Sequence, residues 1–138
     1  MHMKILLPLD DSEFAEKNLA YIKPFAKSMG AELSLLRVVL IPTMTPDSMN
    51  YAPMVTEAEE VIKKQKSSLE ADGFKVSAKV VTCYGKVGPV INNEAKKLGV
   101  DMIAIGARGK SVVRNLFLGT VADDVAHNAS CPVLIIRQ

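Results

Sequence analysis

Short apolar runs alternate with segments of helical period along the whole chain, and this alternation restricts the fold more than any other feature. The runs at residues 4–9, 102–105 and 132–137 are almost continuously apolar, which is typical of strands buried on both faces, and the mainly apolar run at 32–40 predicts a further strand. A fifth run, at 74–82, alternates apolar and polar residues and indicates an edge strand. The connections are long enough for right-handed crossovers. The pattern predicts an α/β fold, a three-layer open parallel sheet of five strands with helices on both faces.

The helices are expected between recognisable start and stop signals. Asp11 or Ser12 can cap the first helix, Gly30 ends it, and Pro24 is expected to kink or shorten it. Its expected inward face comprises Ala15, Leu19, Ile22, Phe25 and Met29. The later helices are expected over 55–71, over 87–98 with an inward face of Val87, Ile91, Ala95 and Leu98, and from Thr120 onward.

Residues 41–54 show neither a helical nor a strand period and carry three prolines. We expect a long loop here. Loops of this length are often functional, so both a lid over a ligand and a solvated insertion remain open interpretations.

Length and composition indicate a single domain over residues 1–138. The chain has 138 residues, of which 49% are hydrophobic, enough to bury a core. Met1 and His2 precede a second methionine, Met3, which we interpret as the natural start. No signal peptide is recognised. No apolar run reaches the ~20 residues needed to span a bilayer.

Charge and cysteine content argue against several classes of function. The net charge is +2, with 17 basic and 15 acidic residues, so no nucleic-acid-binding surface is expected. Cys83 and Cys131 form no CxxC pair, which disfavours a metal or redox centre. A reduced, cytoplasmic protein is the expectation.

Three glycines between the fourth strand and the last helix carry the strongest functional signal. Gly106 and Gly109 are separated by two residues, Gly119 follows after nine more, and Thr120 begins a helix. Glycine lets backbone amides approach a ligand, and a helix start presents free N–H groups and a positive dipole end. The segment also contains three basic residues and no acidic one; they are Arg108, Lys110 and Arg114. The stretch therefore predicts a phosphate-binding site.

The end of the first strand differs from that of an ordinary dinucleotide-binding fold. Such a fold has a glycine-rich loop there that takes the pyrophosphate, whereas this chain has Asp10 and Asp11. Carboxylates repel phosphate, so the phosphate end of a nucleotide is expected at the glycines. Asp10 is left to accept hydrogen bonds from a ribose or a base.

The glycine spacing, together with an opening KILLPLDDSE and a closing CPVLIIR, resembles the universal stress protein family, in its ATP-binding subgroup. The resemblance covers essentially the whole chain. It implies a Rossmann-like sheet of strand order 3-2-1-4-5 and a cytoplasmic stress-response protein that uses ATP as a switch. Magnesium is implied by the triphosphate, because no cluster of metal ligands is recognised.

The resemblance also implies roles for individual residues. Backbone amides of Gly109, Gly119, Thr120 and Val121, with the Thr120 hydroxyl, would hold the phosphates at the loop that Gly106 opens. Arg108 would neutralise the β- and γ-phosphates. Asp10 would hold the ribose, and Pro8, Leu9 and Val39 would line the adenine pocket.

The glycine stretch has three other interpretations. Thr120 and Asp123 match a T-x-x-D capping box, which would make the stretch purely structural. A P-loop ending at Gly109-Lys110-Ser111 would need its first glycine at Ala104, inside a strand. Catalysis by Ser or Cys with His is disfavoured because His127 lies in the last helix, where an exposed structural position is expected.

Two further expectations concern assembly and turnover. The apolar last strand, residues 131–137, would pair with a second copy if it lies at a sheet edge, giving a homodimer. No Glu, Gln or His lies close to the glycines in sequence to orient a water, and Asp123, the nearest candidate, is expected to cap the helix, so ATP is expected to be bound far better than it is hydrolysed. The alternative function is a dimeric interaction protein of the same fold that binds no nucleotide.

Overall fold

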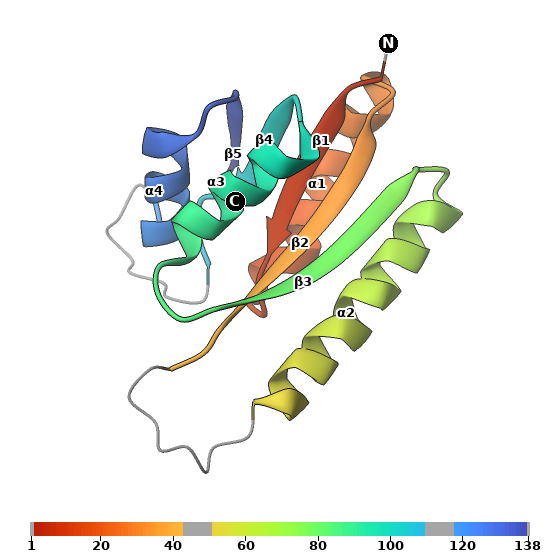
Figure 1. Ribbon diagram of the computed structural model, residues 1–138. Helices are drawn as coiled ribbons and strands as arrows, with labels where there is room; N and C mark the ends of the chain where they lie inside the picture. The colour runs from red at the N-terminus through yellow and green to blue at the C-terminus, as the bar shows by residue number, and fades with distance from the viewer. Residues whose placement is uncertain (1, 43–50, 110–117, 138) are drawn as a thin grey trace.

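The computed structural model describes residues 2–42, 51–109 and 118–137. Strands and helices alternate in it as the sequence pattern predicts (Figure 1). In chain order they are β1 (Lys4–Leu9), α1 (Phe14–Ser28), β2 (Glu32–Leu40), α2 (Ala52–Ala71), β3 (Val76–Cys83), α3 (Val87–Leu98), β4 (Met102–Gly106), α4 (Thr120–Asn128) and β5 (Val133–Ile136).

The strands form one parallel sheet in the order β3-β2-β1-β4-β5, which confirms the expected topology. β1 is the central strand, with Leu7 opposite Leu35 of β2 and Ile5 opposite Met102 of β4. The chain moves outward from β1 to β3 and then returns to the other side of β1 at β4. The strand order therefore reverses between β1 and β4, and in open α/β sheets this reversal is where ligands bind.

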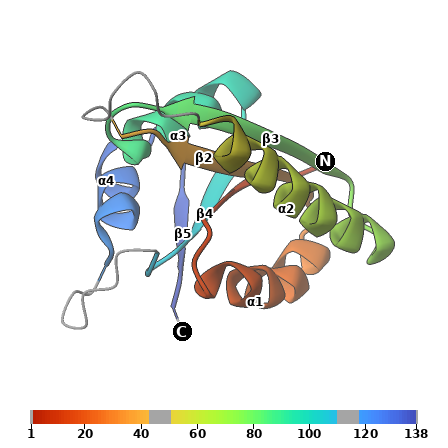
Figure 2. The ribbon, with the colours of Figure 1, turned by 90° about the horizontal axis from the view of Figure 1, so that it is seen from below.

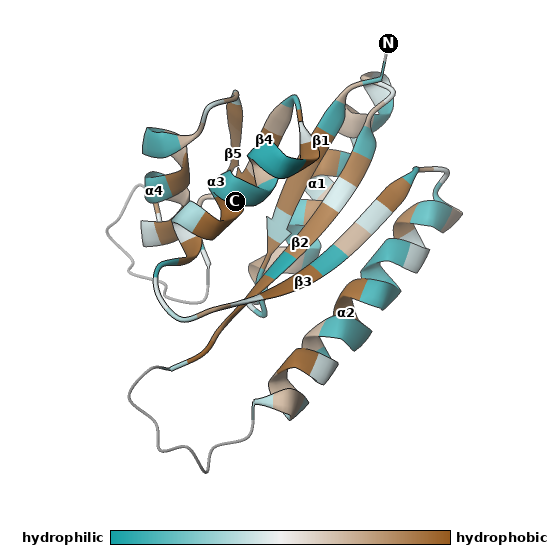
Figure 3. Cartoon of the chain, viewed as in Figure 1, coloured by the Kyte–Doolittle hydropathy of each residue, from teal (hydrophilic) through white to brown (hydrophobic). Residues whose placement is uncertain are grey.

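Helices cover both faces of the sheet and bury two separate apolar cores. α1 and α2 pack on one face, over alternate strand residues such as Ile5, Leu7 and Leu35. α3 and α4 pack on the other, over Leu6 and Leu36. Figure 2 shows α1 and α4 on opposite sides of β5. Figure 3 shows strands dominated by hydrophobic residues and helices with mixed surfaces, the pattern of a sheet buried on both faces.

Several helix details differ from the expectation. α1 is not shortened at Pro24 but continues to Ser28. Met29 follows the helix and is 41% exposed, and Leu98, at the end of α3, is 38% exposed, so neither lies inward. Both residues stand at or just beyond the end of their helix, and a helical period alone does not show whether an element covers that position.

The start of α2 also corrects the expected loop. α2 begins at Ala52 rather than at Val55, with Pro53 in its first turn, where a missing N–H costs nothing. Of the expected loop at 41–54, residues 43–50 lie outside the described part of the chain. The lid interpretation therefore stays untested.

Both expected edge positions are confirmed by the strand order, with β3 at one edge and β5 at the other. β3 itself begins at Val76, two residues later than expected.

Cys83 and Cys131 are both free thiols. None of the helices within the described ranges has the length and apolarity required to cross a membrane.

Candidate functional site

The candidate site lies where β1 and β4 end, at the reversal of strand order. β1 leads into Asp10, β4 ends at Gly106 and continues to Gly109, and Gly119 stands immediately before α4. The residues predicted to bind the phosphates and the ribose therefore lie on three separate segments at the carboxyl end of the sheet. Lys110 and Arg114, the other predicted basic residues, lie outside the described residues, as does Ser111.

Gly109 lies directly against the carboxylate of Asp10. A Cβ built on Gly109 would stand 2.7 Å from Asp10 Oδ2, closer than real Cβ contacts allow. Asp10 is oriented from its other side, because its Oδ1 accepts a hydrogen bond from the backbone amide of Ser12 at 2.9 Å. Gly109, in the segment that follows β4, and the end of β1 are therefore in contact, as the predicted ligand placement requires.

Gly119 is packed against the backbone of the same loop. Its amide donates a hydrogen bond of 2.6 Å to the Ala107 carbonyl. A Cβ built on it would lie 3.1 Å from that carbonyl oxygen and 3.8 Å from the Gly109 nitrogen. Neither glycine of this pair has a positive φ. What requires glycine at Gly109 and Gly119 is close approach, not an unusual backbone conformation.

The first turn of α4 contains the backbone amides that were predicted to hold the phosphates. Thr120 is the first helical residue and Gly119 is the N-cap residue, with no side-chain capping bond. The expected Thr120–Asp123 capping box is therefore wrong, because Thr120 stands one position too late to cap. The amide of Asp123 bonds to the Gly119 carbonyl at 2.9 Å. The amides of Thr120 and Val121 precede it and are among the N–H groups that a helix leaves without an intrahelical partner.

Asn18 of α1 lies against Gly106 and was not predicted as part of the site. A Cβ built on Gly106 would collide with the side-chain amide of Asn18, 3.0 Å from its Cγ. Asn18 is only 8% exposed and sits among the apolar residues of α1. A polar residue on an apolar helix face was the one signal that could have indicated it.

Arg108 is the described cation nearest to the glycines in sequence, and its side chain is exposed. Its guanidinium carbon lies 5.9 Å from the centre of the Phe14 ring, within the range of a cation–π contact. Phe14 is the first residue of α1 and is 8% exposed. No feature of the sequence pairs these two residues.

The residues predicted for the adenine are placed differently from one another. Pro8 is half-buried, and by strand alternation it shares the α3–α4 face with Leu6. Leu9 belongs to the core beneath α1 and α2, so only its backbone can face a ligand. Val39, in β2, is 3% exposed.

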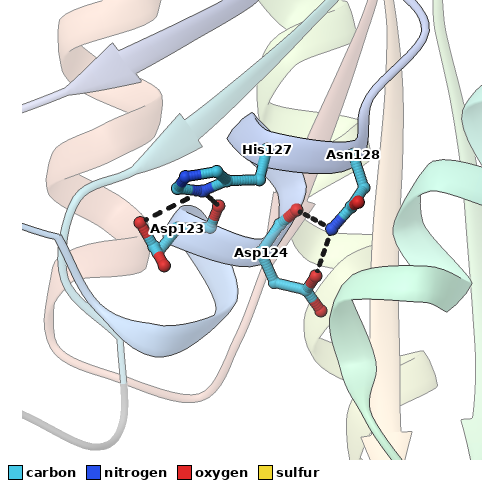
Figure 4. A network of polar contacts seen from close by, with 4 residues as sticks. All are labelled: Asp123, Asp124, His127 and Asn128. Atoms are coloured by element: carbon cyan, nitrogen blue, oxygen red, sulfur yellow. Dashed lines mark hydrogen bonds and ion pairs between the residues drawn. The ribbon is translucent and has the colours of Figure 1, made fainter.

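The exposed face of α4 carries a polar network (Figure 4). His127 Nδ1 lies 2.9 Å from the Asp123 carbonyl and 3.4 Å from the Asp123 carboxylate. The hydrogen bond to that carbonyl, aided by the charge of Asp123, raises the pKa of His127 above its usual value. The Asn128 side-chain amide donates to Asp124 Oδ1 at 2.8 Å. His127 thus occupies the exposed structural position that was expected.

The titratable groups give no sign of a metal centre. Within the described residues no group of three or more His, Cys, Asp or Glu side chains could hold an ion. Burial raises the pKa of the Cys131 thiol, which disfavours the reactive thiolate.

Fold and site together define a Rossmann-like α/β protein whose glycines and helix start meet an aspartate at the strand-order reversal. A family model described as the universal stress protein family matches residues 1–137. The universal stress protein YxiE of Bacillus subtilis is 32% identical over 148 residues, covering 99% of this chain and 100% of that protein. The chain therefore belongs to the universal stress protein family.

Solved structures agree with this assignment. The structure of MJ0577 from Methanocaldococcus jannaschii has a TM-score of 0.79 at 29% identity, over 100% of this chain and 97% of that one. A universal stress protein from Archaeoglobus fulgidus, solved in complex with dAMP, has a TM-score of 0.72 at 21% identity, over 97% of each chain. The latter similarity concerns the fold alone.

Proposed function

We propose that this protein binds ATP and uses it as a ligand that sets conformation in a stress response. The observation that carries the proposal is the contact of Gly109 with Asp10, 2.7 Å from a built Cβ to Oδ2, beside the start of α4. This contact places Asp10, the proposed nucleoside acceptor, beside Gly109, whose amide is a proposed phosphate donor. The dAMP complex of the Archaeoglobus fulgidus relative supports an adenine nucleotide as the ligand.

The phosphates would lie at the glycines. The amides of Gly109, Thr120 and Val121, with the Thr120 hydroxyl, would donate to phosphate oxygens, and the dipole of α4 would favour the negative charge. The amide of Gly119 already donates to Ala107, so Gly119 would contribute mainly space.

The nucleoside would lie toward β1 and β2. Asp10 would accept hydrogen bonds from the ribose, and Pro8, Val39 and the backbone of Leu9 would surround the adenine. The described residues offer no cluster of metal ligands, so Mg²⁺ would be held mainly by the phosphates, whose charge it would neutralise. We propose binding without rapid hydrolysis.

Calorimetric titration of the purified protein tests the proposal. ATP with Mg²⁺ is expected to bind, and tripolyphosphate, which lacks the nucleoside, to bind more weakly because Asp10 and the adenine contacts go unused. In thermal denaturation, ATP at 100 times its Kd should add about 2.7 kcal/mol to the free energy of unfolding. No heat and no stabilisation at millimolar ATP would refute the proposal.

We further propose a homodimer formed by residues 131–137. The dimer is compatible with ATP binding, and it is also the basis of the alternative function, a dimeric interaction protein that binds no nucleotide. β5 is an edge strand, and its residues Val133, Leu134 and Ile135 are only half-buried. An exposed apolar edge invites pairing with a second copy, and an isologous pair is the simplest closed arrangement.

A reduced cytoplasmic setting is consistent with two free cysteines.

Ile135→Lys is expected to convert the dimer to a monomer in light scattering, because the charge would be buried between the copies. Val81→Lys is the matched control, since Val81 is also half-buried, on the same face, but in the opposite edge strand β3. This control should remain dimeric. A wild-type protein that is monomeric at micromolar concentration would contradict the dimer and leave the ATP proposal standing.

A further inference from the structure

The contact between Arg108 and Phe14 joins the glycine loop to the start of α1. The guanidinium carbon lies 5.9 Å from the ring centre. Phe14 is 8% exposed, whereas Arg108 is exposed. A flexible cation on the surface is thus placed beside the face of a fixed ring, which attracts it electrostatically.

Local hydrogen bonds fix the ring in relation to Asp10. The Phe14 amide donates to Ser12 Oγ at 3.3 Å, and the Ser12 amide donates to Asp10 Oδ1 at 2.9 Å. The segment from Asp10 to Phe14 is therefore one hydrogen-bonded turn. The carboxylate assigned to the nucleoside and the ring that contacts Arg108 are held in one unit.

The backbone on both sides of Arg108 is also constrained. The Ala107 amide donates to the Ile136 carbonyl at 2.8 Å, and the Ala107 carbonyl accepts from the Gly119 amide at 2.6 Å. On the other side, Gly109 lies against Asp10. The remaining freedom of Arg108 is in its long side chain, and the Phe14 ring restricts that freedom at the guanidinium end.

We propose that Phe14 is a positioning residue that holds the Arg108 guanidinium for the terminal phosphates, and that this pair sets the preference for nucleoside triphosphates over monophosphates. The inference rests on the proposed function. A guanidinium binds phosphate oxygens through two parallel hydrogen bonds only when it is correctly oriented. A side chain that is ordered before binding loses less conformational entropy when the ligand arrives.

The effect is specific to the number of phosphates. The single phosphate of AMP can be satisfied by the amides at the start of α4, whereas the β- and γ-phosphates need a further cation. Loss of the ring should therefore weaken the binding of ATP and leave the binding of AMP unchanged. A purely structural role of Phe14 would weaken both nucleotides alike.

The test compares Phe14→Leu with Phe74→Leu by calorimetric titration with ATP and AMP. Phe74 is an equally buried ring, 9% exposed, with Lys27 at 5.8 Å from its centre, so it loses the same kind of contact away from the site. Phe14→Leu should raise the Kd for ATP about two- to fivefold, the scale of an exposed cation–π contact. AMP should be unaffected, Phe74→Leu should change neither nucleotide, and Phe14→Tyr should keep the wild-type ratio.

A double variant isolates the pair. In an Arg108→Gln background, Phe14→Leu should no longer alter the ratio of the ATP and AMP dissociation constants; Phe14→Met replaces Phe14→Leu if the latter does not fold. A change of that ratio in the absence of Arg108, or equal weakening of ATP and AMP in Phe14→Leu, would overturn the role of Phe14 while ATP binding by the wild type stands. Wild-type protein that binds neither nucleotide would overturn this inference together with the proposed function.

Discussion

Two glycines of this protein each lie against the carboxylate of a different aspartate, and the two contacts stand in different parts of the fold. Gly109 meets Asp10 at the carboxyl edge of the sheet, where a built Cβ would be 2.7 Å from Oδ2. Gly88, in the first turn of α3, meets Asp124 of α4, where a built Cβ would be 2.6 Å from Cγ. The first contact joins two loops, whereas the second joins two helices in one layer.

The surroundings distinguish the two contacts. Asp124 accepts a hydrogen bond from Asn128, one turn further along its own helix, and it stands beside the positive end of α3 (Figure 4). Its carboxylate is thus used in packing α3 against α4. Asp10 bonds to the Ser12 amide and stands where the strand order reverses. A glycine beside an aspartate indicates a site only when its position in the fold is known.

The largest expected effect separates the two glycines. Gly109→Val should abolish the stabilisation by ATP, about 2.7 kcal/mol at 100 times the Kd, because the branched side chain would occupy the space between loop and carboxylate. Gly88→Val should lower the free energy of unfolding by about 1–3 kcal/mol through overpacking of α3 against α4, yet retain the ATP response. Thermal denaturation with and without ATP measures both effects. An ATP response lost equally in both variants would erase the distinction.

A smaller effect is expected from the aspartates themselves. Asp10→Ala should raise the dissociation constants of ATP and AMP by similar factors, since loss of a hydrogen bond to a charged acceptor costs about 1.5–3 kcal/mol. Asp124→Ala should leave both dissociation constants unchanged and destabilise the fold by about 0.5–1.5 kcal/mol through the lost hydrogen bond. Calorimetric titration measures the dissociation constants of both variants, and denaturation measures their free energies of unfolding. Selective weakening of ATP by Asp10→Ala would show that the nucleotide lies in the reverse orientation.

The smallest expected effect is a pH dependence on the exposed face of α4. The pKa of His127 is raised above 6.5 by its hydrogen bond to the Asp123 carbonyl. Its contribution to stability should therefore be fully present below about pH 6.5 and lost as the pH rises through the folded-state pKa. NMR titration should give a pKa above that of a histidine in an unstructured peptide, and His127→Ala should remove this part of the pH dependence of unfolding. An equal or lower pKa for His127 would contradict the geometry.

Much of the fold could be predicted from local patterns. The mainly apolar runs located β1, β2, β4 and β5, because strands in the interior of such a sheet are largely apolar, and the alternation at 74–82 located the edge strand β3. Gly30 was correctly assigned to the end of α1, where its φ of 58° favours glycine. The strand order, by contrast, came from the family resemblance, because crossover lengths do not specify which strands are neighbours.

The candidate site was predicted only in part. Asp10 was assigned to the site because its charge is unsuited to the phosphate position of ordinary dinucleotide folds, and the structure does bring it beside Gly109. Asn18 and Phe14 were missed because each contacts a residue far away in the chain, Gly106 and Arg108 respectively. The Thr120 capping box was wrong because a one-residue shift of the helix start transfers the capping position to Gly119.

The sequence by itself determined the alternation of strands and helices, the two-sided burial of the sheet and the places where a side chain is missing, since these depend on local period and residue size. Only the tertiary structure decided which aspartate each glycine meets, that Leu9 is turned into the core, and that Arg108 lies over Phe14. The physical reason is that such contacts depend on how several crossovers and two helical layers pack together, and a local sequence pattern does not specify that packing.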